Sequence, residues 1–200
     1  MSEVLKTDKD LAIVAFRENT SFVHYFPEKE SSKKLEPESL ILVDIWARLI
    51  EKNSPYADIT WMAYYGKTVP REMKKVFEVV ANTRDACLDF IKDYLSRGGT
   101  PSVGAIEKYH SDLITKSGYG EGIDHLVGHS IGFDSPHGKY PSMHVKNKEP
   151  ILKNIGYTIE PGIYLKNRFG VRSEIDFYID DNNGVVVTTE VQDKIVRIYV

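Results

Sequence analysis

The chain has 200 residues, which suffices for one domain with a substantial core or for two very small ones. Its composition, 42% hydrophobic and 28% charged with a formal net charge of −3, is typical of a globular protein and gives no reason to expect a nucleic-acid partner. The start lacks an apolar stretch of signal-peptide length, and no apolar run is long enough to span a bilayer. We therefore expect no membrane association and a cytoplasmic location. The single cysteine, Cys87, excludes an intrachain disulfide and is expected in the core.

The first predicted elements form a β-hairpin. After a charged loop at residues 28–36, residues 39–50 form a β-rich apolar stretch that is interrupted at Asp44. Asn53-Ser54-Pro55 marks a turn, and residues 56–66 are predicted as the returning strand.

Two helices are predicted in the middle of the chain. Pro70 suits the first position of one helix, which Gly98-Gly99 ends. Thr100-Pro101 is predicted as the N-cap and first residue of the other, which ends near Gly118. The apolar positions expected to face the core are Met73, Phe77, Val80, Cys87, Ile91 and Tyr94, followed by Val103, Ile106, Tyr109 and Leu113.

The last third of the chain is predicted to be β-rich, with strands at 155–164, 171–179, 184–189 and 194–200. A turn at 180–184 separates two of them. Strands, then helices, then strands indicate an α+β domain with an antiparallel sheet and helices on one face.

Three predicted strands carry carboxylates where an ordinary sheet would not place them: Asp44, Asp58 and Glu174. Bulky apolar residues flank Asp44 on both sides, and a desolvated, unpaired carboxylate is costly and tends to find a cation. For Glu174 the alternation with Arg172 and Asp176 equally allows a charged face in contact with water.

Histidine and a fourth carboxylate extend this set. His129 lies in the segment GHSIGF, inside a twenty-residue window that also contains His125, His137 and His144. Glu160 ends a predicted strand just before a Pro-Gly turn. Four carboxylates and one neutral imidazole carry a charge of −4, which two divalent cations would neutralise. Such ligands suit manganese, iron, cobalt or zinc, and a two-metal site activates water and polarises a carbonyl for hydrolysis.

The order Asp, Asp, His, Glu, Glu resembles the pita-bread metallopeptidases: prolidase, aminopeptidase P and methionine aminopeptidase. The matching segments are VDIWARLIEKNSPYADIT, DHLVGHSIG, TIEPGIY and GVRSEID, and the likeness extends from about Asp10 to the C-terminus. It is strongest to bacterial Xaa-Pro peptidases. The resemblance implies a pita-bread fold, in which helices cover the outer face of a curved antiparallel sheet. It also implies one catalytic domain over residues 1–200, with a shortened N-terminus and no N-terminal prolidase-type domain.

Carried over to this sequence, the resemblance makes Asp44 a terminal ligand of one metal, while His129 and Glu160 bind the other. Asp58 and Glu174 would bridge the two cations, of which manganese is the first expectation and cobalt, zinc or iron the alternatives.

The remaining site residues also follow from the resemblance. Glu160 would shuttle protons, and His24 and His137 would act at the substrate. Residues implied to orient ligands or bind substrate are His125, Arg172 and Thr60.

Four departures from the family pattern matter. Asp44 and Asp58 are 14 residues apart, and His137 lies eight residues after His129, so His144 is an alternative. Trp61 replaces a common arginine, which would alter substrate selection. Only 43 residues precede Asp44, so we expect an uncovered apolar sheet face and a homodimer.

Three functions compete. The first is an exopeptidase that hydrolyses the N-terminal bond of short peptides, with Xaa-Pro as the expected target. The second is a catalytically silent pita-bread module that binds peptides or proteins, and the third is a metal-free amidinohydrolase of the creatinase type. Both alternatives typically lack ligands that this chain retains.

Overall fold

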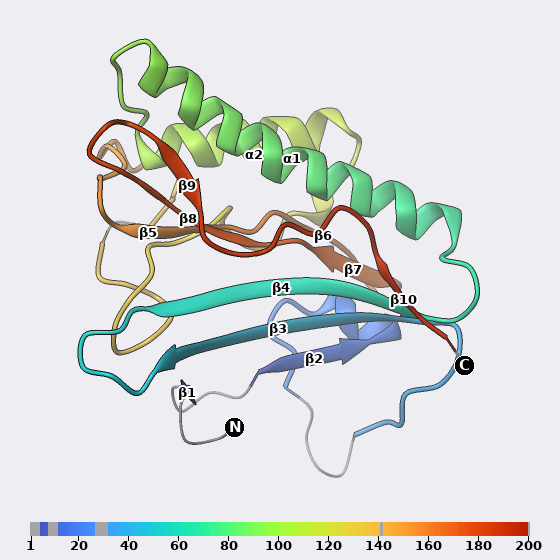
Figure 1. Cartoon of the computed structure of the whole chain (residues 1–200). Coiled ribbons are helices and arrows are strands. Elements are labelled where there is room, and N and C mark those ends of the chain that lie inside the picture. The colour runs from blue at the N-terminus through green and yellow to red at the C-terminus, as the bar shows by residue number, and fades with distance from the viewer. Residues whose placement is uncertain (1–4, 8–11, 27–31, 141, 200) are drawn as a thin grey trace.

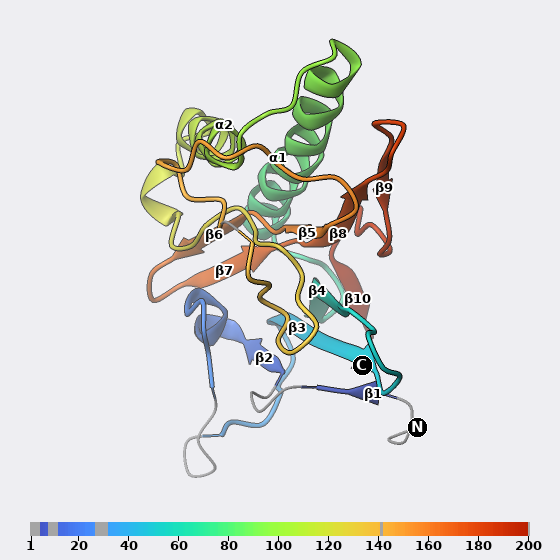
Figure 2. The same ribbon diagram turned by 90° about the vertical axis from the view of Figure 1, so that its left-hand side faces the viewer.

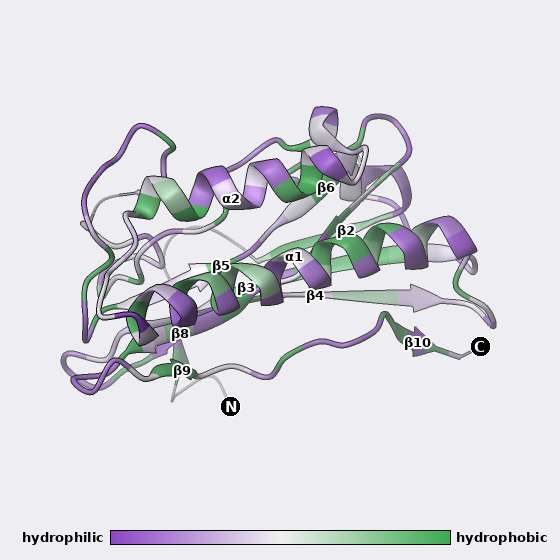
Figure 3. Ribbon diagram, turned by 90° about the horizontal axis from the view of Figure 1, so that it is seen from above, coloured by the Kyte–Doolittle hydropathy of each residue, from purple (hydrophilic) through white to green (hydrophobic). Residues whose placement is uncertain are grey.

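The computed structural model describes residues 5–7, 12–26, 32–140 and 142–199. Helices α1 (Arg71–Ser96) and α2 (Val103–Lys116) lie together on one side of the strands, as Figures 1 and 3 show from two directions. Two short 3-10 helices, η1 (Arg17–Ser21) and η2 (Gly120–Gly122), precede β3 and follow α2. In the described part of the chain, neither helix has the length and apolar character needed to cross a bilayer.

Within the described ranges, the strands form three sheets. The largest has the order β1-β3-β4-β10, with β2 also paired to β3; its members are β1 (Leu5–Lys6), β2 (Ile13–Phe16), β3 (Ser39–Leu49), β4 (Tyr56–Tyr65) and β10 (Val196–Ile198). A second sheet has the order β5-β8-β9, formed by β5 (Gly156–Ile159), β8 (Ile175–Ile179) and β9 (Val185–Val187). The third pairs β6 (Gly162–Leu165) with β7 (Phe169–Arg172).

The predicted hairpin is present as β3 and β4, which pair antiparallel with Asp44 opposite Thr60. The sheet is mainly antiparallel, as expected, with one departure: β10 pairs parallel to β4. Gln192, which precedes β10 in the chain, explains why this segment lies along β4. Its side chain accepts the Met62 N–H at 2.8 Å and donates to the Met62 carbonyl at 2.6 Å, which holds the incoming chain along the edge of β4.

Two predicted strands are each divided in two. The stretch 155–164 breaks between β5 and β6, and 171–179 breaks between β7 and β8. Pro161 has no N–H to donate to a ladder. Its carbonyl instead accepts the Ser173 N–H at 3.3 Å, while the Glu174 N–H donates to Thr60 at 3.3 Å. The breaks leave Glu160 and Glu174 outside the ladders, so the regular alternation predicted for Glu174 does not hold.

The start of α2 also differs from the prediction. Ser102, not Thr100, caps the helix, since its hydroxyl accepts the Ala105 N–H at 3.1 Å. The buried stripe of α2 is rotated toward Glu107 and His110, whereas the predicted Tyr109 and Leu113 are only half-buried.

The core consists of two apolar clusters under α1. One lies against β3 and β4, and the other lies between α1, α2 and the sheet of β5 and β8. Cys87 belongs to the second, as predicted, and burial raises the pKa of its thiol to about 12. The predicted core residue Tyr94 is instead 41% exposed, and Leu95 takes the buried position.

Candidate metal centre

One cavity of about 150 Å³ brings the five predicted metal ligands together. They come from β3, β4, the connection between η2 and β5, and the two breaks in the later strands. In Figure 2 that connection, coloured yellow to orange, runs from the helices down to the hairpin, where Gly132 accepts the Tyr56 N–H at 2.9 Å. The five predicted ligands among the residues that line the cavity are Asp44, Asp58, His129, Glu160 and Glu174.

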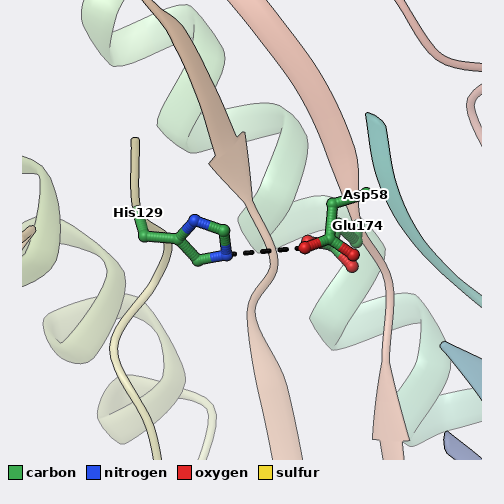
Figure 4. Close-up of side chains that lie close together, drawn as sticks. All are labelled: Asp58, His129 and Glu174. Atoms are coloured by element: carbon green, nitrogen blue, oxygen red, sulfur yellow. Dashed lines mark ion pairs between the residues drawn. The ribbon is translucent and has the colours of Figure 1, made fainter. Parts of the chain in front are cut away.

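Three of these side chains could hold a single cation. Asp58, His129 and Glu174 each offer a ligand atom within 4.8 Å of the others, and Figure 4 shows His129 facing the two carboxylates from the opposite side. The Nε2 atom of His129 lies 3.7 Å from Asp58 Oδ2 and 3.4 Å from Glu160 Oε1.

The pairing of β3 with β4 positions the two aspartates. Alternation along β4 buries Asp58 and Thr60 on the same face, while Trp61 lies on the other face and lines neither cavity of this site. In the described structure, Trp61 therefore has no direct contact with either cavity through which it could influence substrate selection, as was predicted.

A chain of polar contacts joins the hairpin to the break before β8. The Thr60 hydroxyl donates to Glu174 Oε2 at 2.8 Å and accepts from Arg172 Nε at 3.0 Å. The Arg172 guanidinium also pairs with Asp44 Oδ2, leaving Asp44 Oδ1 buried without a hydrogen-bond partner. Thr60 and Arg172 thus contact predicted ligands directly.

Burial and mutual repulsion make the carboxylates favour protonation or a cation. Burial, followed by repulsion from Asp44 and Glu160, raises the pKa of Asp58, and burial with repulsion from Asp58 does the same for the pKa of Glu174. Burial raises the pKa of Glu160 to about 7. Burial also lowers the pKa of His129, which favours the neutral imidazole that metals require.

These features fit a divalent cation. A buried, unpartnered carboxylate oxygen and a crowded set of four carboxylates with one imidazole are the donors that oxygen-preferring transition metals select.

The other predicted histidines surround an adjoining cavity of about 350 Å³, lined by His24, His125, His129, His137, Glu160 and Arg172 among others. The ring of His137 contacts that of His129 edge-on, with 4.1 Å between centroids. His125 Nε2 lies 2.9 Å from the Tyr164 hydroxyl, and burial lowers the pKa of His125 to about 3. His144 is exposed and lines neither cavity, whereas His137 lines both.

Three supporting residues were missed by the sequence interpretation. Asp176 Oδ2 accepts the Asp58 N–H at 2.9 Å. Thr158 accepts the His129 N–H at 3.0 Å and donates to Glu160 at 3.2 Å.

The third missed residue is Glu107, whose Oε2 accepts the Val127 N–H at 2.7 Å. The Val127 carbonyl accepts the Glu160 N–H at 2.7 Å, so α2 is linked to the candidate metal centre through one residue. In the sequence, Glu107 could have been found because it is a carboxylate beside the apolar positions of a predicted helix. Asp176 could have been found from its two-residue spacing from Glu174.

Comparison with known proteins places the chain in a family. The sequence matches metallopeptidase family M24 over residues 7–181. It is 29% identical over 184 residues to the Bacillus subtilis protein YkvY, covering 92% of this chain and 47% of that protein. It is 28% identical over 172 residues to an Xaa-Pro dipeptidase of Lactobacillus delbrueckii, covering 86% of this chain and 42% of that enzyme.

A recombinant prolidase from Thermococcus sibiricus has a matching structure, with a TM-score of 0.78 at 25% identity, covering 94% of this chain and 47% of that one. The chain spans less than half the length of the curated relatives it matches. The matched residues and the shared architecture together show that this chain is a pita-bread protein of metallopeptidase family M24.

Proposed function

We propose that this chain carries the dinuclear centre of an exopeptidase that hydrolyses the N-terminal bond of short peptides, with Xaa-Pro as the preferred bond. The observation that carries the proposal is the meeting of all five candidate ligands in one cavity. Names of relatives support the substrate class, since one is an Xaa-Pro dipeptidase and another a prolidase.

Asp44, Asp58, His129, Glu160 and Glu174 would hold two divalent cations, with manganese the first expectation and cobalt, zinc or iron the alternatives. When bound, such cations polarise a carbonyl and make water acidic enough to supply a nucleophile at neutral pH.

The chain's own residues divide the remaining work. Glu160 lines both cavities, so its carboxyl group can carry a proton from the nucleophile to the leaving amine. His24 and His137 also line both cavities, which suits donation to the substrate carbonyl and orientation of the scissile amide.

His125 serves the substrate side. Its Nδ1 lies 2.8 Å from the Leu126 carbonyl and its Nε2 contacts the Tyr164 hydroxyl, so the ring is held in one orientation at the cavity wall. Arg172 and Thr60 hold Asp44 and Glu174 in place through the contacts described above.

The second candidate is a silent module that binds peptides without cleaving them. Retention of the full ligand set argues against it, because a binding module needs no clustered, buried carboxylates and their burial is costly.

The test is hydrolysis by the purified chain after removal of metal and titration with Mn²⁺. We expect two Mn²⁺ per chain, no activity in chelator, and at least tenfold faster cleavage of Ala-Pro than of Ala-Ala. Binding of two cations without hydrolysis would favour the silent module, and absence of Mn²⁺ binding would overturn the metal centre itself.

A matched pair of histidine variants refines the test. His137→Ala should lower turnover about 10²-fold or more, the usual contribution of one acid–base or oxyanion group. His144→Ala, at an exposed site outside both cavities, should leave turnover unchanged.

A further inference from the structure

Arg84, in the middle of α1, carries a positive charge into the interior of the protein. Its side chain is 1% exposed and lines neither cavity of the candidate metal centre. The carboxylate that it contacts at 2.8 Å, Asp85, is 55% exposed and belongs to the same helix. Because a buried ion pair by itself adds little to stability, the role of Arg84 depends on what its other hydrogen bonds hold in place.

One guanidinium nitrogen of Arg84 joins two segments that are distant in the chain. Its Nη1 donates to the Ser173 hydroxyl at 2.6 Å and to the Gln192 carbonyl at 3.0 Å. Ser173 and Gln192 are both buried, so water does not compete for these hydrogen bonds. Hydrogen bonds from a charged donor are about twice as strong as those between neutral groups.

The first partner, Ser173, links the two breaks that carry candidate ligands. It stands next to Glu174 in the break between β7 and β8, and its N–H donates to the Pro161 carbonyl at 3.3 Å. Pro161 directly follows Glu160. Since both glutamates lie outside the strand ladders, strand pairing alone does not set their separation, and the residue that Arg84 holds connects them.

The second partner leads to β4. The Gln192 side chain makes both hydrogen bonds with the backbone of Met62, on the strand that also carries Asp58 and Thr60. By holding the Gln192 carbonyl, Arg84 fixes the backbone from which this side chain reaches β4. One side chain of α1 is therefore connected to all three segments that supply Asp58, Glu160 and Glu174.

We propose that Arg84 is a positioning residue of the dinuclear centre, which sets the separation of Glu160 and Glu174 through Ser173. The inference rests on the proposed function, because the two glutamates act there as metal ligands. Partners outside the ligand set typically change metal affinity about 10–100-fold. A residue that only completed the core would change the stability of the fold and leave the affinity of the folded chain for metal unaltered.

Ser173→Ala is the mildest test, because it removes only the hydroxyl that accepts from Arg84. In calorimetric titration with Mn²⁺, we expect about tenfold weaker binding of at least one of the two cations. Arg84→Met removes both donors at similar length and should give the same loss. Arg84→Lys keeps a charged donor and should recover most of the affinity. Should Arg84→Met fail to fold, Ser173→Ala and Arg84→Lys carry the test.

Two control variants separate positioning from general stability. Val80→Ala, one turn earlier in α1, opens the buried apolar cluster, so it should destabilise the chain toward urea and keep the Mn²⁺ affinity. Asp85→Ala removes the exposed partner of the same guanidinium and should also keep it. A loss of Mn²⁺ affinity in Val80→Ala equal to that in Arg84→Met would show a general structural effect and overturn the proposal.

Electron paramagnetic resonance adds a readout that does not depend on peptidase activity. The spectrum of the Mn²⁺-loaded chain depends on the distance between the two cations, so it should change in Ser173→Ala and not in Asp85→Ala. Unchanged Mn²⁺ affinity in Ser173→Ala and Arg84→Met would overturn the positioning role while leaving the proposed function intact. Failure of the unmodified chain to bind two Mn²⁺ would overturn the proposed function, and this inference with it.

Discussion

Removal of the Glu107 carboxylate should reveal how strongly α2 supports the metal centre. Glu107 is 7% exposed, accepts the Val127 N–H at 2.7 Å and lies 3.5 Å from His110 Nδ1. Val127 stands two residues from both His125 and His129, and its carbonyl accepts the Glu160 N–H. Loss of this one acceptor therefore loosens three site residues at once.

The expected cost of Glu107→Ala can be worked from these contacts. The buried Val127 N–H loses its partner, which costs about 1–3 kcal/mol. The lost burial of one methylene adds about 0.8 kcal/mol. We expect a loss of about 2–4 kcal/mol in the free energy of unfolding, against about 1 kcal/mol or less for Glu107→Gln, which keeps shape and acceptor.

Urea denaturation and Mn²⁺ titration of the same samples provide the assay. Mn²⁺ affinity should fall about tenfold in Glu107→Ala, comparable with the loss of an outer partner of a ligand, and should recover in Glu107→Gln. Asp112→Ala, on the exposed face of the same helix, is the control, with a change of about 0.5 kcal/mol or less. A Glu107→Ala chain that unfolds and binds Mn²⁺ like Asp112→Ala would refute the reasoning.

Four further outcomes are expected. Glu160→Gln should keep the fold but lower the turnover of Ala-Pro about 10²–10⁴-fold, and unchanged turnover with verified metal content would contradict its role. In chelator, the folded chain binds more protons than the unfolded chain between the ordinary Glu160 pKa of 4.5 and its raised value of about 7. Its free energy of unfolding should therefore fall as pH rises through that window. Urea denaturation at pH 5 and 7.5 measures this, and a higher free energy of unfolding at pH 7.5 would contradict the prediction. Gly128→Ala should prevent proper folding, seen by circular dichroism, because its Cβ would lie 2.2 Å from the Thr158 carbonyl oxygen. Exposed Val14 of β2 lies on the same sheet face as exposed Ile45 and Leu49 of β3, so light scattering should find a homodimer, and a concentration-independent monomer would contradict that expectation.

Local sequence determined the elements whose signals are local. Turn residues and period-two apolar runs predicted the hairpin of β3 and β4, and helical spacing predicted α1. The types and order of the candidate ligands could also be predicted from the sequence, because isolated carboxylates in apolar strands are costly without a cation. The family resemblance rested on these same residues.

Tertiary structure alone decided the contacts between distant segments. Thr60 meets Glu174 across 114 residues, and Arg172 meets Asp44 across 128. No local pattern encodes such pairs, because they depend on how β3 and β4 pack against the later strands.

The same dependence explains where the structure departs in detail from the sequence predictions. The breaks at Glu160 and Glu174 arise where backbone groups find partners outside their own ladder, and the parallel pairing of β10 follows from the hold of Gln192 on Met62. The choice of His137 over His144 and the support from Glu107 likewise require knowing which segments face the cavity. The sequence by itself determined which groups could carry the chemistry; only long-range packing decided which of them meet.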